Sequence, residues 1–287
     1  MSAFILSDRY FAPESGHISS YFSQLYMLIG HSSVRYTILD TEKNTFVGLA
    51  SYTFSPAPKS SAELRAGLER LFSEDDYLAR KYPSVTIGID SERFTMVPFP
   101  LFDDIRAREI LSFNFRLQEN SYVLTDKIAE ISAYLVYEMD NEILSFFRER
   151  FKDSLIMNRM SGLLRTGSAL QRQSGEPGRF MVNIRENFID LVFFRDNQPV
   201  LCNAYPYSGK EDILYFILNA CEQLKLRPGD LDIIVSGQFQ PDSETARLLN
   251  RYVGKLKVAD PIQLFEYNGI LKQMAPHRYT DLFSLAL

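Results

Sequence analysis

The sequence predicts an α/β protein made of two tandem copies of one β-β-β-α-β-α-β module. Two observations carry this prediction. Residues 25–54 and 179–207 form an internal repeat, because each reads as three short strands joined by two turns and the two align nearly end to end with a single gap. A helical pattern then follows each copy. Hairpins that lead into a β-α-β crossover form a mixed sheet flanked by helices.

The strands of the repeat are runs of apolar, β-branched and aromatic residues separated by turn formers, which is the pattern of β-hairpins. In the first copy we expect strands at Leu25–Ile29, Val34–Leu39 and Phe46–Phe54. In the second copy we expect them at Phe180–Ile184, Phe188–Arg195 and Val200–Tyr205.

The elements after the hairpins continue the duplication. Ser60 to Glu63 has the spacing of a capping box and predicts the start of a helix, and Ser208 opens the corresponding helix of the second copy. The first half then has an expected strand at 131–137, a helix at 141–150, a strand at 154–157 and a helix from Met160. The second half has a strand at 231–235, a helix at 243–252 and a strand at 256–258.

The two halves differ by an insertion, which we place at residues 73–130. Within it we expect strands at 85–89, 94–97 and 122–125 and a helix near 104–111. Residues 166–178 lose hydrophobic periodicity and gain Gly, Ser, Gln and Pro, which predicts a domain boundary. We therefore expect one domain over residues 1–172 and a second over 173–287, with residues 1–24 as an extended arm that packs on the first domain or meets a partner.

This order of elements resembles a known fold. A tandem β-β-β-α-β-α unit resembles the ribonuclease-H-like module, and two such modules make the actin-like ATPase fold. The chain is similar in plan to bacterial actin-like proteins of the pilus-assembly PilM and FtsA kind, and more narrowly to an uncharacterised bacterial family of unknown function with this fold. The resemblance implies that the insertion binds a family-specific partner; the alternative is that it only extends the first sheet and covers its edge.

Composition excludes several classes of protein. The net charge of −5 argues against a nucleic-acid partner, which needs clustered Lys and Arg. No apolar run approaches the ~18 residues of a membrane span, and the first residues do not form a signal peptide. We therefore expect a cytoplasmic protein. Cys202 and Cys221 are too few for a metal motif or a disulfide framework, so we expect buried free thiols.

The resemblance also implies where a nucleotide would lie. Actin-like ATPases hold phosphates in the turn between the first two strands of each half, with the pattern Asp-x-Gly. The Asp positions magnesium, and the Gly lets backbone N–H groups approach phosphate oxygens. The matching positions here are Leu28-Ile29-Gly30, followed by His31, Ser32 and Ser33, and Asn183-Ile184-Arg185. The carboxylate is missing from both, and Arg185 places a long side chain where backbone would meet phosphate.

Five residues are the candidate cofactor-binding positions of this degenerate cleft, and they are Gly30, Ser32, Ser33, Arg185 and Gly237. Gly237 belongs to them because it follows the strand at 231–235, where this fold has a glycine-rich turn. We predict no catalytic residue, no metal ligand and no cofactor, with magnesium-bound ATP as the alternative. Five carboxylates are interpreted as solvated loop groups, namely Asp90, Asp103, Asp104, Asp190 and Asp232.

The leading hypothesis is therefore a non-catalytic actin-like scaffold or adaptor that works through a protein partner or self-association. A nucleotide-binding ATPase with weak or slow hydrolysis is the alternative, because the run Gly30-His31-Ser32-Ser33 and Gly237 are retained. A third reading is a sugar-kinase-like or nuclease enzyme on the same module, which would require a catalytic carboxylate in the cleft.

Overall fold

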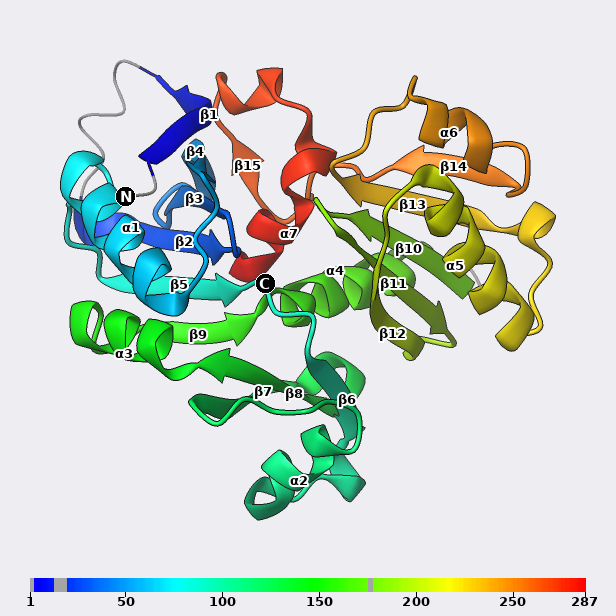
Figure 1. Cartoon of the computed structure of the whole chain (residues 1–287). Helices are drawn as coiled ribbons and strands as arrows, with labels where there is room; N and C mark the ends of the chain where they lie inside the picture. Colours follow the sequence, from blue (N-terminus) through cyan, green and yellow to red (C-terminus); the bar gives the residue numbers. More distant parts are fainter. Residues whose placement is uncertain (1–2, 13–19, 175–177) are drawn as a thin grey trace.

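The structure of the protein is a computed structural model that describes residues 3–12, 20–174 and 178–287. Two α/β units lie side by side, and a smaller third sheet lies below them in the view of Figure 1. The predicted fold class is confirmed, since each unit has a mixed sheet with helices packed on it.

The first unit is built on a seven-stranded sheet in the order β1-β4-β3-β2-β5-β9, to which β15 is added beside β4. Its strands are β1 (Ala3–Phe11), β2 (Ser23–Ile29), β3 (Ser33–Asp40), β4 (Thr45–Ser55), β5 (Ser84–Ile89), β9 (Leu155–Asn158) and β15 (Glu266–Tyr267). Helices α1 (Ser61–Glu74) and α3 (Asn141–Arg150) pack on one face of it. Alternate residues of β2 therefore enter two cores, with Leu25 and Met27 under these helices and Leu28 on the opposite face.

The second unit has a five-stranded sheet in the order β12-β11-β10-β13-β14. Its strands are β10 (Gly178–Ile184), β11 (Phe188–Arg195), β12 (Gln198–Pro206), β13 (Asp232–Gly237) and β14 (Lys255–Val258). Helices α5 (Lys210–Gln223) and α6 (Glu244–Leu249) cover one face, and α4 (Arg159–Ser174) packs on the other. Both cysteines are free, with Cys221 buried and Cys202 half-buried.

The strand pairing corrects the predicted match between the halves. In the second unit β10 pairs in parallel with β13, and in the first unit β2 pairs in parallel with β5. The counterpart of β13 is therefore β5, and not the strand expected at 131–137. That strand is β8 (Ala133–Asp140), the centre of a separate sheet in the order β6-β8-β7. It resembled a core strand in the sequence because its side chains are almost all buried.

The insertion consequently follows β5 and ends with β8, instead of covering residues 73–130. It comprises β6 (Phe94–Pro98), α2 (Ala107–Ser112), β7 (Ser121–Ile128) and β8. It neither extends nor pairs with the first sheet among the described residues. Asp126 fixes it to the body, because one of its carboxylate oxygens accepts hydrogen bonds from the Asn158 N–H (2.7 Å) and the Ser161 hydroxyl (2.6 Å) at the start of α4.

The residues predicted as a domain boundary are helical as far as Ser174, where α4 ends. Hydrophobic periodicity is lost there because the buried positions of the helix are polar, namely Thr166, Ser168 and Gln171. The division at residue 172 stays a prediction. None of the helices in the described part of the chain is long and apolar enough to cross a membrane.

Both ends of the described chain pack on the first sheet. Of the arm predicted at residues 1–24, β1 pairs antiparallel with β4, whereas residues 13–19 lie outside the described ones. At the other end, β15 pairs with β4 and α7 (Thr280–Phe283) enters the core around Leu28. The last segment therefore returns from the second unit to complete the first (Figure 1).

The close approach of α4 to this last segment generates a test. A Cβ added to Gly162 would lie 2.8 Å from the carbonyl oxygen of Ser284, which is backbone and cannot move aside cheaply. Gly→Ala in a helix interior normally adds about 1 kcal/mol of stability. We expect Gly162→Ala instead to lower the free energy of unfolding by about 1–2 kcal/mol, as overpacking does. Urea unfolding measures this, with Gly229→Ala as the matched control, since a Cβ there meets nothing within 4 Å. Equal stability of the two variants would contradict the packing.

The burial of Asp126 generates a second test, which concerns how the free energy of unfolding depends on pH. Burial raises its pKa to about 6, above its ordinary range, although the hydrogen bonds from Ser161 and Asn158 oppose the shift. A carboxyl group with a raised folded-state pKa is protonated more readily in the folded protein, so it adds stability below about pH 6 that is lost as pH rises. We expect the wild type to gain about 1 kcal/mol relative to Asp126→Asn between pH 7 and pH 5. Urea unfolding of both proteins across this range checks it, and parallel pH profiles would refute it.

Candidate functional site

A cleft of about 1210 Å³ lies between the two units, at the ends of their central strands. Its walls are the β2–β3 turn, the residues after β5, the β10–β11 turn, the start of α5 and the end of β13. All five predicted cofactor-binding positions line it, and these are Gly30, Ser32, Ser33, Arg185 and Gly237. The duplication places equivalent turns on opposite walls, which is why sequence matching found this cleft.

The two glycines have backbone roles in the turns. Gly237 has φ +83°, and a Cβ there would lie 2.1 Å from the carbonyl oxygen of Ile184, so no other residue fits. Gly30 closes the β2–β3 turn by donating its N–H to the Ser33 carbonyl (2.8 Å). A Cβ on Gly30 would meet only the Ser33 hydroxyl within 3.4 Å, which is the movable end of a side chain.

A network of two arginines and two aspartates lies beside the cleft, and Asp90 and Arg185 are the two of its members that line the cleft. Arg159, the first residue of α4, is fully buried and donates two hydrogen bonds to the carboxylate of Asp190 on β11 (2.5 and 2.6 Å). Its Nε donates to Asp90, which follows β5 (2.5 Å). Arg185 joins the same two carboxylates, at 2.7 Å to Asp90 and 3.1 Å to Asp190. Four charges thus form a neutral cluster that connects both units and the helix between them.

The amide of Asn183 continues this network. It donates to Asp190 (2.9 Å) and accepts from the Ser236 hydroxyl (2.9 Å), which links β10, β11 and β13. Leu28, the corresponding residue of the first unit, is buried in the core that includes Leu285. The two positions where the Asp-x-Gly pattern has its carboxylate therefore hold a hydrogen-bonded amide and a packed apolar side chain.

The charges keep both aspartates ionised. Burial alone would raise the pKa of Asp190, but the positive charges of Arg159 and Arg185 outweigh it, so the pKa lies below the ordinary range. The pKa of Asp90 is lowered in the same way against the effect of burial. Two desolvated carboxylates of this kind are stable only while both guanidinium groups stay in contact with them.

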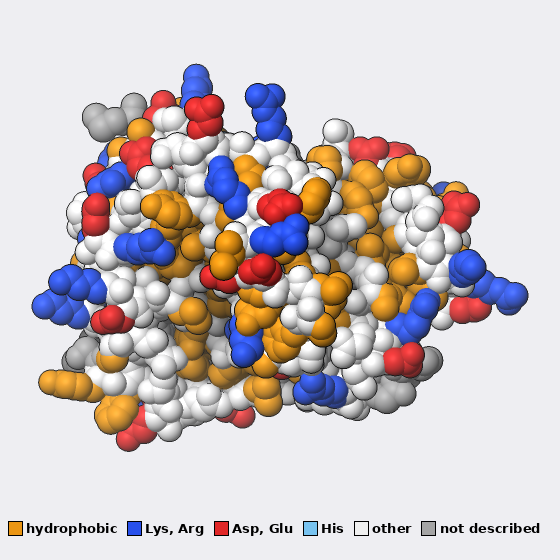
Figure 2. All heavy atoms as spheres, turned by 90° about the horizontal axis from the view of Figure 1, so that it is seen from below, with side chains coloured by type: hydrophobic (Ala, Val, Ile, Leu, Met, Phe, Trp, Pro, Cys, Tyr) orange, Lys and Arg blue, Asp and Glu red, His pale blue; other side chains and the backbone are white. Residues whose placement is uncertain are grey.

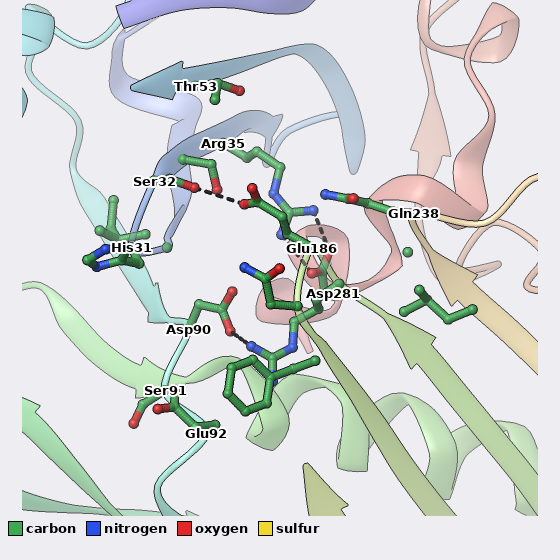
Figure 3. Close-up of a pocket in the computed structure, with 18 of the residues that line it drawn as sticks. His31, Ser32, Arg35, Thr53, Asp90, Ser91, Glu92, Glu186, Gln238 and Asp281 are labelled. Carbon is green, nitrogen blue, oxygen red and sulfur yellow. Dashed lines mark hydrogen bonds and ion pairs between the residues drawn. The ribbon is translucent and has the colours of Figure 1, made fainter. Parts of the chain in front are cut away.

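Two further contacts close the cleft from its sides (Figure 3). The Ser32 hydroxyl of the β2–β3 turn donates to the carboxylate of Glu186 in the β10–β11 turn (2.9 Å), so the two duplicated turns touch directly. Arg35 of β3 makes a two-pronged contact with Asp281 of α7, at 3.0 and 2.8 Å. Side chains of the chain itself thus join the elements that face each other across the cleft.

The structure corrects two interpretations made from the sequence. Asp90 and Asp190 are not solvated loop groups, whereas Asp103, Asp104 and Asp232 are exposed. Arg159 was missed altogether. A signal for it exists, because Arg159 is the one charge in the run from Leu155 to Leu164, and a charge in an apolar run needs a buried partner.

These residues do not fit a magnesium–phosphate group. The described residues contain no cluster of three or more His, Cys, Asp or Glu side chains that could hold a metal ion. Both oxygens of Asp190 already accept hydrogen bonds from guanidinium groups, and Asp90 accepts from two of them. A cation placed among them would lie against the charges of Arg159 and Arg185.

Comparisons with known proteins agree with this architecture. The sequence profile described as "Protein of unknown function (DUF3822)" matches residues 14–256. A solved Bacteroides thetaiotaomicron protein with an actin-like ATPase fold and unknown function is 20% identical, with a TM-score of 0.78 over 93% of this chain and 97% of that one. The PilM-PilN type IV pilus biogenesis complex gives 13% identity and a TM-score of 0.61, over 94% and 98%. No curated protein matches the chain. The fold is therefore that of the actin-like ATPases.

The buried network generates a stability test. Arg159→Met removes a buried cation and leaves Asp190 and Asp90 undercompensated, so we expect a loss of about 3–5 kcal/mol in the free energy of unfolding. Adding Asp190→Asn to this variant removes one excess negative charge and should restore part of the loss, because charges in one network are not additive. Urea unfolding of the single and double variants measures this coupling. The exposed Arg251→Met is the control and should change little, and simple additivity would contradict the network.

Proposed function

The chain belongs to the DUF3822 family of proteins of unknown function, and we propose that it is a non-catalytic actin-like protein that acts as a scaffold or adaptor through protein contacts. The observation that carries this proposal is the position of two guanidinium groups. Arg185 lies in the second phosphate turn of the fold and, together with Arg159 at the start of α4, it holds the carboxylates of Asp90 and Asp190.

Catalysis of phosphoryl transfer by this fold needs groups that these turns lack. A carboxylate must be free to hold magnesium, and backbone N–H groups must be open to phosphate oxygens. Here Asp190 is fully engaged, and Leu28 cannot bind an ion. The N–H of Arg185 donates to the carbonyl of Phe188 (2.8 Å), and that of Gly30 donates to Ser33. The turns therefore hydrogen-bond to themselves.

The side-chain contacts around the cleft favour one fixed arrangement of the two units. A nucleotide bound between two domains contacts both of them, so that its binding and release are coupled to closure and opening of the domains. In this chain the two units are connected by side chains of the protein itself, notably Arg185 with Asp90 and Ser32 with Glu186. A body held in one arrangement is suited to presenting surfaces to other proteins. The similar PilM structure is a complex with PilN, which supports a protein-binding use of the fold.

Thermal unfolding with and without millimolar Mg-ATP tests the proposal. A ligand at about 100 times its dissociation constant adds about 2.7 kcal/mol, which shifts the Tm of a domain of this size by several degrees. We expect no shift. A clear shift that disappears in Gly30→Val would overturn the proposal in favour of a nucleotide-binding ATPase, because the wider side chain would block the first phosphate turn. Gly229→Val, outside the cleft, is the matched control.

A further inference from the structure

We propose that the groove between β7 of the insertion and α3 binds an extended, acidic segment of a partner protein, which adds to β7 as a further strand. This inference rests on the proposed adaptor role and names the site and the kind of partner. It is carried by the backbone of β7, by the shape of the groove and by its charge.

The groove has a volume of about 820 Å³ and separates the insertion from the first unit. One wall is formed by five consecutive residues of β7, from Ser121 to Thr125. Consecutive residues of a strand point to opposite faces of its sheet, so a cavity lined by all five runs along the edge of the strand. The other walls are α2, α3 and the segment from Lys152 to Ile156 that leads into β9.

The edge of β7 that faces away from β8 is unpaired in the sheet that the described residues form. Two arginines show which backbone groups point outward. The carbonyl of Ser121 accepts from Arg108 (3.2 Å) and that of Lys127 accepts from Arg165 (3.3 Å), so both are turned away from β8. Groups two residues apart point the same way in a strand. Val123 and Thr125 therefore direct their N–H and C=O groups to this edge.

A strand edge with free backbone groups is a template for another strand, and partner segments use it by main-chain hydrogen bonding. At such a site the backbone contacts supply affinity, and the alternate side chains supply specificity. The lining fits this mode because it has apolar surface beside the strand, including the half-buried Val123 and Ile156 and the half-exposed Tyr122. Every second side chain of a bound segment can contact this surface.

The positive charge of the groove favours a partner segment that carries acidic residues. Three cations line it, Arg108, Arg148 and Lys152, against one carboxylate, Asp104. A segment in which acidic residues alternate with apolar ones would place carboxylates beside these cations and apolar side chains on the floor. Figure 2 shows the face of the molecule on which the insertion lies, where hydrophobic side chains gather with both basic and acidic side chains among them.

Selection of a displayed library of short random peptides on the full-length protein tests this inference. We expect enrichment of extended sequences in which Asp or Glu alternates with apolar residues. The enriched peptides, made synthetically with a fluorescent label, should bind in an anisotropy titration. Thr125→Pro should weaken this binding at least about tenfold, because it removes an outward N–H but no hydrogen bond to β8, and edge positions tolerate proline.

A second variant keeps the test independent of the fold of β7. Arg148→Glu with Lys152→Glu should weaken the same peptides to a similar extent, whereas the charge-matched control Lys81→Glu with Lys272→Glu should not, because both residues lie outside the groove. Thermal unfolding establishes that each variant is folded. Absence of enrichment, or peptides that bind these groove variants as tightly as the wild type, overturns the inference.

Two further outcomes separate this inference from other possibilities. If the wild type forms a dimer in sedimentation and Thr125→Pro abolishes it, the occupant of the edge is a second copy of the chain and the assignment of an acidic partner falls. If Mg-ATP stabilises the protein while acidic peptides still bind the groove, the proposed non-catalytic function fails and the groove assignment stands.

Discussion

The full burial of the Arg159 charge is the constraint to which the centre of this protein conforms. A guanidinium group removed from water is tolerated only when carboxylates meet it with good geometry. Asp190 supplies one such contact from the second sheet, and Asp90 supplies the other from the end of β5. Since Arg159 begins α4, one side chain fixes the position of that helix relative to both units.

The rest of the cleft follows from this arrangement. Once Asp90 and Asp190 lie close together, a second cation is needed to balance them, and Arg185 provides it from the turn after β10. The actin-like fold brings the ends of its central strands to one place, and in this chain the place is filled by the protein's own charges. The ionic connection between the units and the poor fit of these residues to a magnesium–phosphate group thus have one physical cause.

Local patterns predicted the hairpins, since alternating aromatic and β-branched residues with turn formers between them define a strand without reference to its neighbours. The prediction failed where the pairing partner of a strand, and not its own sequence, decides which sheet the strand joins. The strand at 131–137 and β5 are both apolar, and only pairing with β2 shows which belongs to the first sheet. The cleft was found because the duplication identified Gly30 and Arg185. The buried network beside the cleft was not predicted, because the contact between Arg159 and Asp190 joins residues 31 positions apart on different elements.

The return of the last segment to the first sheet has a consequence for biosynthesis. The side chain of Asn44 donates to the carbonyl of Leu264, 220 residues further along, and β15 and α7 complete the core around Phe46 and Leu28. Contacts over such separations form late, because a long loop must close before they can be made. During translation the first unit therefore emerges with an open apolar face, while the second unit is still being made. The nascent chain must avoid aggregation over that interval, and it reaches its native state only after residues 266–286 have left the ribosome.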